Sequence, residues 1–291
     1  MPHDHGIIAA AITPRDLKGA LDPGAAFELI DYLCKAKVHG IALFTAVGEY
    51  PAFSLEERSR LLYLAVKRSR VPIYACAGSI GLDDSLQLAR EARRGGAAGV
   101  LLPPPHFFPY LQPELCEFFL QFSRQLGEGI DVYLANTPDF TSELLPETAC
   151  HLLASGRFAG IVDPVAGNGA LHGAPVALLS GDDAGFPAAR SAGAHGALSA
   201  AACAVPELVV ALDAALLAGN LPEVERLHGL LREFLAWVAQ FPFPVAVKVS
   251  TGLRGVKLGV QRVLLSAERQ RLLEAFCEWF KGWLPSWQKT L

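Results

Sequence analysis

Eight short apolar segments alternate with helical stretches along the first three quarters of the chain, and this alternation restricts the fold more than any other feature. The expected strands cover residues 7–12, 40–44, 72–76, 99–102, 131–134, 160–162, 176–179 and 196–199. They are short and combine aliphatic with small residues, which is typical of strands buried on both faces of a parallel sheet.

Helical patterns fill most of the intervals between these strands. The clearest helices are expected at residues 25–36, 55–68, 83–94, 113–126, 145–154 and 184–192. Ser54 followed by Glu57 forms a capping-box pattern at the start of the second helix. Eight strands, each followed by a helix or helical turn, predict an α/β fold, a (β/α)8 TIM barrel.

An open, doubly wound parallel sheet is the alternative architecture. Such a sheet commonly carries a glycine-rich dinucleotide-binding fingerprint directly after its first strand. The nearest match here, at residues 167–173, follows the sixth strand and has one residue too many. We therefore interpret residues 167–173 as a glycine-rich loop and favour the barrel.

The strand pattern stops near residue 220. Beyond it, residues 222–240 and 266–283 read as helices joined through the Phe-Pro-Phe-Pro stretch at 241–244. We expect a barrel over residues 1–220 and a C-terminal helical appendage over 221–291. Trp237, Trp279 and Trp283 lie on the appendage, where packing against the barrel is the first interpretation and an oligomer contact the second.

Composition excludes several classes of protein. The net charge is −4 without a basic cluster, which argues against nucleic-acid binding. Hydrophobic residues make up 52% of the chain, but no apolar run approaches the roughly 20 residues that span a bilayer. The six cysteines form no C-x-x-C pair and no signal peptide precedes them, so we expect reduced thiols in a cytoplasmic protein.

The active site of such a barrel lies at the carboxyl ends of its strands. The residues there that we predict to line a ligand pocket are Thr45, Val47, Glu49, His106, Phe107, Asn136, Phe140, Val162 and Asp163. Four of these nine residues are apolar, and each of the others carries one polar or charged group. We expect a small-molecule ligand there, with a carbonyl compound or a carboxylic acid as candidates, and no cofactor.

These strand ends resemble motifs of the dihydrodipicolinate synthase and N-acetylneuraminate lyase family, in the same order over nearly the whole chain. The matching segments are V-G-E at 47–49 with L-E-E-R at 55–58, N-T-P at 136–138, G-I-V-D-P at 160–164, L-L-S-G-D-D at 178–183 and F-P-V at 243–245. The family's own motifs include G-T-T-G-E, Y-N-x-P and G-I-K-D-x-S-G. The resemblance implies the barrel fold and an assembly of two or four copies.

Members of this family are class I aldolases, in which a barrel lysine forms a Schiff base with pyruvate and a tyrosine shuttles protons. By the resemblance, the matching residues here are Val162 for the lysine, Ala135 for the tyrosine, Ala46 and Val47 for the paired threonines, Phe107 for a second tyrosine lent by a neighbouring subunit, and Phe140 for an arginine. All are apolar, so none can form an imine or transfer a proton. The resemblance therefore implies a family member that is not a working pyruvate aldolase.

Lysines offer little replacement for the missing amine. The chain has no lysine between Lys67 and Lys248, and we place Lys248 in the appendage, away from the catalytic end. Lys18 follows the first strand and is the only lysine expected near the strand ends, in a solvated turn.

Three functions remain open. The first is a barrel that has lost Schiff-base chemistry and binds a less polar ligand or serves as a scaffold, as the coherent apolar replacement favours. The second is an enzyme acting on a keto or hydroxy acid through acid–base or metal-assisted chemistry, for which Glu49, His106 and Asp163 form a conceivable but unspecific set. The third keeps the family's chemistry through Lys18 or another amine.

Overall fold

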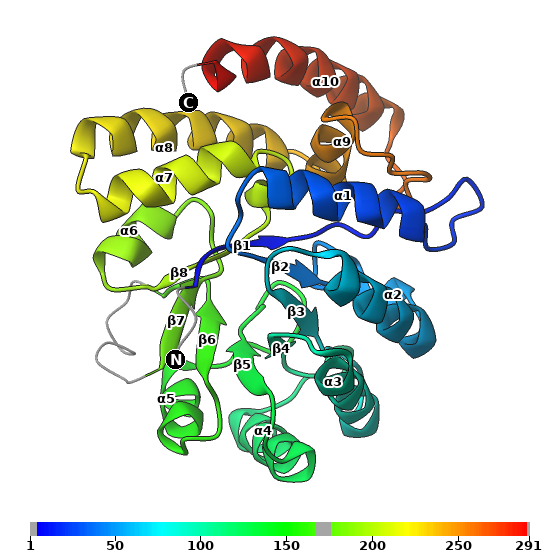
Figure 1. Cartoon of the computed structure of the whole chain (residues 1–291), viewed down its shortest axis with the longest axis vertical. Coiled ribbons are helices and arrows are strands. Elements are labelled where there is room, and N and C mark those ends of the chain that lie inside the picture. The colour runs from blue at the N-terminus through cyan, green and yellow to red at the C-terminus, as the bar shows by residue number, and fades with distance from the viewer. Residues whose placement is uncertain (1–4, 167–175, 290–291) are drawn as a thin grey trace.

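The computed structural model describes residues 5–166 and 176–289 and contains a closed barrel of eight parallel strands (Figure 1). The strands are β1 Gly6–Ala10, β2 Gly40–Leu43, β3 Ile73–Cys76, β4 Gly99–Leu102, β5 Asp131–Ala135, β6 Gly160–Asp163, β7 Ala177–Ser180 and β8 Gly196–Ser199. Each strand pairs with the next, and β8 closes on β1. The predicted (β/α)8 fold is confirmed, whereas the glycine-rich loop at 167–173 lies outside the described residues.

Glycine and tyrosine share one layer near the amino ends of the strands. The even-numbered strands all begin with glycine, and a side chain added to Gly99 would lie 2.9 Å from the Tyr133 ring. Tyr74 is the register partner of Gly99, and Tyr133 that of Gly160. In this layer, a large tyrosine side chain on one strand thus lies beside a glycine on the next, which is how a small barrel fills its interior.

His5 closes the amino end of the barrel. Its ring centroid lies 5.5 Å from that of Tyr133, and only 5% of the residue is exposed. Because His5 precedes β1 and Tyr133 lies on the opposite strand β5, the two rings meet across the barrel interior. His5 is therefore a packing residue of the barrel interior, while His3 lies outside the described residues.

Helices surround the strands and extend beyond them (Figure 1). Their bounds are α1 Pro23–Lys35, α2 Leu55–Arg68, α3 Leu82–Gly95, α4 Gln112–Leu126, α5 Pro146–Ala154, α6 Phe186–Ser191, α7 Pro206–Leu217, α8 Leu221–Val238, α9 Val245–Leu253 and α10 Ala267–Gln288, with short 3-10 turns η1 Tyr50–Ala52 and η2 Ala201–Cys203. The predicted capping box of Ser54 and Glu57 opens α2.

Two helices, α7 and α9, were absent from the expected set. Helix α7 has the sequence PELVVALDAALL, which is apolar on nearly all sides and therefore lacks the polar stripe of an amphipathic helix. Helix α9, VAVKVSTGL, is short and rich in β-branched residues, which favour strands by propensity. In both cases packing against neighbouring helices decides the structure.

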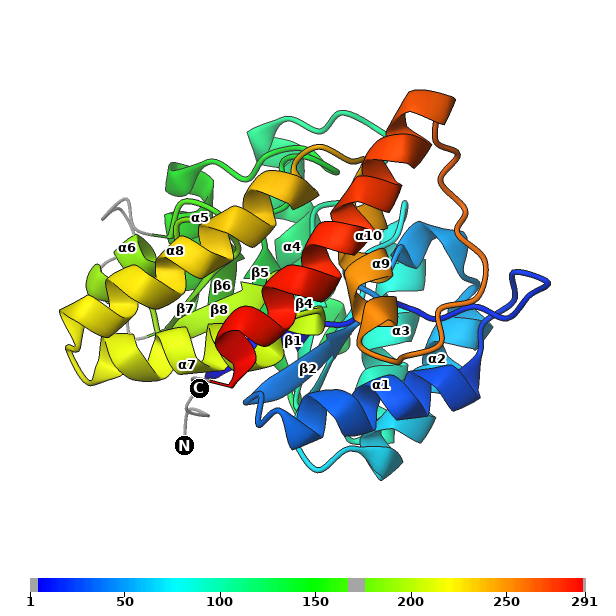
Figure 2. The ribbon, with the colours of Figure 1, turned by 90° about the horizontal axis from the view of Figure 1, so that it is seen from above.

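The C-terminal helices form their own aromatic layer. Figure 2 shows α10 crossing the molecule over α9, and Trp283 of α10 stacks on Phe234 of α8 with ring centroids 6.1 Å apart. Trp279 and Trp283 stack on each other at 4.9 Å. These tryptophans therefore hold α10 on α8. The division of the chain at residue 220 stays a prediction, since α7 and α8 pack closely across it.

No helix in the described ranges has the length and apolar character required to cross a membrane.

We predict that Gly99→Ala destabilises the barrel by about 1–3 kcal/mol, the usual cost of overpacking a dense core. The new methyl group would meet the Tyr133 and Tyr74 rings at 2.9–3.1 Å. Gly95→Ala in α3 is the control, because nothing lies within 4 Å of its added methyl group. Chemical denaturation gives the free energy of unfolding of both variants. Equal values for the two would contradict the packing of Gly99 against the tyrosine rings.

Candidate functional site

Two apolar side chains lie side by side where β5 and β6 end. Ala135 is the register partner of Val162, and both residues are buried. Register partners on neighbouring parallel strands point to the same face, and Ala135 shares its face with Tyr133, two residues earlier. Since Tyr133 points into the barrel, Ala135 and Val162 also face the interior, one layer nearer the carboxyl ends of the strands.

Asn136 and Asp163 follow this apolar pair and are bonded to one another. The Asn136 amide donates to the Asp163 carboxylate at 3.1 Å and to the Leu144 carbonyl at 3.1 Å. The other Asp163 oxygen accepts from the backbone N–H of Val165 at 2.7 Å. Both oxygens of this buried carboxylate are thus occupied in holding the loops after β5 and β6.

Glu49 forms a buried ion pair with Lys248. The two charged groups are 2.6 Å apart, and the lysine side chain is only 2% exposed. Lys248 does belong to the appendage, in α9, but the expectation that it lies away from the catalytic end is wrong, because its amine reaches the loop after β2. Lys18 is exposed in a turn organised by the carboxylate of Asp16.

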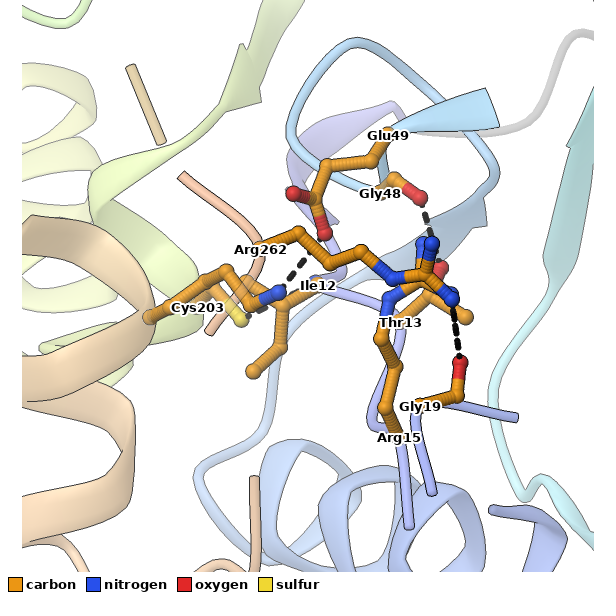
Figure 3. A network of polar contacts seen from close by, with 9 residues as sticks. Ile12, Thr13, Arg15, Gly19, Gly48, Glu49, Cys203 and Arg262 are labelled. Carbon is orange, nitrogen blue, oxygen red and sulfur yellow. Dashed lines mark hydrogen bonds and ion pairs between the residues drawn. The ribbon is translucent and has the colours of Figure 1, made fainter. Parts of the chain in front are cut away.

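Two arginines converge on the Gly19 carbonyl in the loop after β1 (Figure 3). Arg15 is buried, lies 4.0 Å over the Phe53 ring and donates to the Gly19 carbonyl at 3.0 Å. Arg262 donates to the same carbonyl at 3.1 Å. Burial lowers the pKa of Arg15, and the Glu49 carboxylate opposes that shift. The loop after β2 is therefore contacted by Lys248 at Glu49 and by Arg15 at Phe53, while Arg262 contacts the loop after β1.

His106 pairs with Tyr50 across the ends of β2 and β4. The tyrosine hydroxyl lies 3.2 Å from Nδ1 of the histidine. Burial, and then the positive charge of Arg58, lowers the pKa of His106, while burial raises the pKa of Tyr50. Both groups are therefore neutral near pH 7. Sequence reasoning singled out His106 and missed Tyr50, whose only signal was its position directly after Glu49.

Exposed aromatic residues flank His106 at this end of the barrel. Phe107 is 80% exposed, has a φ of 84°, and contacts Phe108 edge-on with centroids 5.0 Å apart. Phe140 is 46% exposed, and its ring centroid lies 5.6 Å from that of Phe243. The side chain of Phe107 is thus directed to the surface, unlike the buried Val47 and Val162.

Two further buried polar residues near the strand ends, Asp183 and Thr45, differ in their contacts. Asp183 accepts from the Ser199 hydroxyl and from the Ala201 N–H, and burial raises its pKa to about 6. Thr45 is buried, and its hydroxyl has no hydrogen-bond partner among the described residues.

The metal set considered from sequence finds no support in the geometry. Among residues 5–166 and 176–289, no group of three or more histidine, cysteine, aspartate or glutamate side chains is arranged to hold a metal ion. Glu49 is paired with Lys248, His106 with Tyr50, and Asp163 with Asn136.

Comparison with known proteins gives one consistent result. The profile of the Dihydrodipicolinate synthetase family matches residues 3–274. A 4-hydroxy-tetrahydrodipicolinate synthase of Symbiobacterium thermophilum is 30% identical over 289 residues, covering 96% of this chain and 97% of that protein.

Solved structures agree with the sequence comparison. The 4-hydroxy-tetrahydrodipicolinate synthase of Methylacidiphilum fumariolicum SolV superposes with a TM-score of 0.88 at 26% identity, covering 98% of both chains. A sialic acid aldolase of Ruminococcus gnavus superposes with a TM-score of 0.86, covering 97% of this chain and 99% of that one. Its 21% identity supports the fold alone.

We predict that Lys248→Met destabilises the protein by about 3–5 kcal/mol, because it leaves the Glu49 carboxylate buried without a partner. The double variant Glu49→Leu/Lys248→Met should recover much of this loss, since neither charge then remains. Lys281→Met is the control, because Lys281 forms an exposed pair with Glu278 and should change little. Urea denaturation gives the free energy of unfolding of the wild type and the three variants. A value for Lys248→Met equal to that of the wild type would contradict the assignment.

Proposed function

The chain belongs to the dihydrodipicolinate synthetase family, and we propose that it is a member that no longer performs Schiff-base chemistry on pyruvate and instead binds a less polar small molecule. The observation that carries this proposal is the pairing of Ala135 with Val162 inside the barrel. By resemblance, these positions match the family's shuttle tyrosine and reactive lysine. Two neighbouring apolar side chains there leave no amine and no proton donor.

The lysines of the chain do not restore the missing chemistry. An imine forms only when an unprotonated amine reaches the keto carbon. The ammonium of Lys248 is buried in an ion pair with Glu49, and Lys18 is exposed in a turn. Neither position provides a free amine beside Val162, so the alternative in which another lysine replaces the reactive one is disfavoured.

The site is also poorly matched to the charge of pyruvate. A carboxylate needs hydrogen-bond donors or a cation once it leaves water, and its burial without them costs several kcal/mol. Ala46 and Val47, at the positions that resemble the family's threonines, carry no hydroxyl. We therefore favour a neutral carbonyl compound over a small carboxylic acid as the ligand.

Acid–base catalysis on a keto or hydroxy acid is the second candidate function. The Tyr50–His106 pair favours it, because both groups can exchange protons and neither is tied into an ion pair. The carboxylates of Glu49 and Asp163 weigh against it, since both already have partners. We rank this function below ligand binding.

We further propose that the protein assembles as a homodimer or tetramer and acts in the cytoplasm. Phe107, Phe108 and Leu111 are all more than half exposed near the carboxyl ends of the strands. Contiguous apolar surface of this kind commonly marks an interface. No disulfide joins the cysteines of the described residues, in keeping with a reducing compartment. A scaffolding role beside an active relative would use the same surface.

Pyruvate and methyl pyruvate form a matched pair that tests the proposed ligand class, because they differ mainly in the charge. We predict that methyl pyruvate gives a saturation-transfer NMR signal with the protein and that pyruvate gives none, owing to the unpaired carboxylate. Val47→Thr, which returns one hydroxyl, should reduce the difference in signal between methyl pyruvate and pyruvate. Stronger binding of pyruvate than of its ester by the wild type would contradict the proposal.

We also predict that Val162→Lys alone creates no aldolase activity. The new amine would face the barrel interior, but Ala135 and Val47 still could not relay a proton or hold the carboxylate. The measurement is pyruvate consumption in the presence of a panel of aldehydes. Turnover that depends on pyruvate in this single variant would show that the remaining residues suffice.

A further inference from the structure

We infer that Tyr50 and His106 form the polar end of the ligand site, where His106 offers an uncharged Nε2–H to an oxygen acceptor on an apolar ligand. This inference deepens the proposed function and rests on it. It identifies the ligand as a neutral molecule with one exposed carbonyl, ether or hydroxyl oxygen on an aromatic or branched body.

Tyr50 is held in one position by its surroundings. A side chain on Gly78 would lie 2.9 Å from the Tyr50 ring and 2.8 Å from Pro103, so the ring passes close against backbone that must be glycine. The Arg58 guanidinium lies 5.4 Å from the ring centroid and donates to the Gly78 and Cys76 carbonyls, both at 2.8 Å. The hydroxyl of Tyr50 is therefore a fixed group.

This fixed hydroxyl determines the tautomer of His106. Tyr50 is 4% exposed, and Nδ1 of His106 is the one hydrogen-bond partner that the described residues offer its hydroxyl. A buried phenol that donates its proton to Nδ1 leaves that nitrogen as the acceptor, which requires the histidine proton on Nε2. The lowered pKa of His106 keeps the ring in this neutral form at pH 7.

The other side of the His106 ring is available to a ligand. His106 is half-buried. Its Nε2 forms no hydrogen bond within the described ranges, and this atom is not fully buried. Its backbone N–H donates to the Ser79 carbonyl at 3.4 Å, which positions the residue beside the end of β3. Nε2 therefore reaches solvent, and the two residues that follow His106 in the chain, Phe107 and Phe108, are both more than half exposed.

The neighbouring charges set the class of ligand. The single nearby cation, among the groups described around this ring, is Arg58, and its two terminal nitrogens already donate to backbone carbonyls. A neutral imidazole adds one donor and no charge, so an anion would remain without compensation. One hydrogen bond together with apolar contact suits a neutral oxygen-bearing ligand.

Acetophenone and ethylbenzene test this inference as probes, because they have similar shapes and differ in the carbonyl oxygen. We expect the wild type to bind acetophenone about fivefold more tightly, the ratio that corresponds to one neutral hydrogen bond. His106→Phe should abolish the preference for acetophenone over ethylbenzene. The same substitution at His151, which is exposed on α5, should preserve it.

Nitrogen-15 NMR of the histidine ring provides a readout that a purely structural role would not affect. We expect the wild type to show a protonated Nε2 and an acceptor Nδ1, with a pKa lower than that of an exposed histidine because of burial. Tyr50→Phe should give a mixture of tautomers together with a weaker preference for acetophenone. A protonated Nδ1 in the wild type would overturn the inference.

The two levels of the proposal fail in different ways. Equal binding of both probes by the wild type would refute the role of His106 while leaving an apolar ligand site in place. Absence of binding by both probes would refute the inference as well, and preference for pyruvate over its methyl ester would separately refute the proposed function.

Discussion

The side chains of the eight strands fill the barrel interior layer by layer, and the choice of side chain in each layer governs both the fold and the chemistry at the carboxyl end. At the amino end, Gly40 and Gly99 make space for Tyr74 and Tyr133, and His5 packs against Tyr133. One layer above Tyr133 lie Ala135 and Val162. Packing that continues apolar up to this level stabilises the barrel but supplies no reactive group.

Charged residues near the strand ends are engaged by the fold itself. Glu49 and Lys248 connect the loop after β2 to α9, and Asp163 connects the loops after β5 and β6 through Asn136. A carboxylate that already has its partners is a poor candidate for catalysis, because displacing them leaves buried polar or charged groups unpaired. Tyr50 and His106 differ from these pairs in being neutral, and His106 is also partly open to solvent.

The sequence predicted the repeating elements well because their signals are local. Residues 99–102 and 196–199 were placed correctly as strands, and the start of α2 was identified from Ser54 and Glu57. Contacts between distant residues were not predictable in the same way. Lys248 and Glu49 are 199 positions apart and His106 lies 56 from Tyr50, so no periodicity or spacing links either pair.

Borohydride reduction in the presence of pyruvate and larger 2-keto acids, followed by intact-protein mass measurement, tests the proposed loss of Schiff-base chemistry most directly. We predict an unchanged mass across the whole panel, because the amine of Lys248 is paired with Glu49 and Val162 cannot react. A mass increase equal to a reduced imine would contradict the account. Peptide mapping would then show whether Lys248, Lys18 or another lysine had reacted.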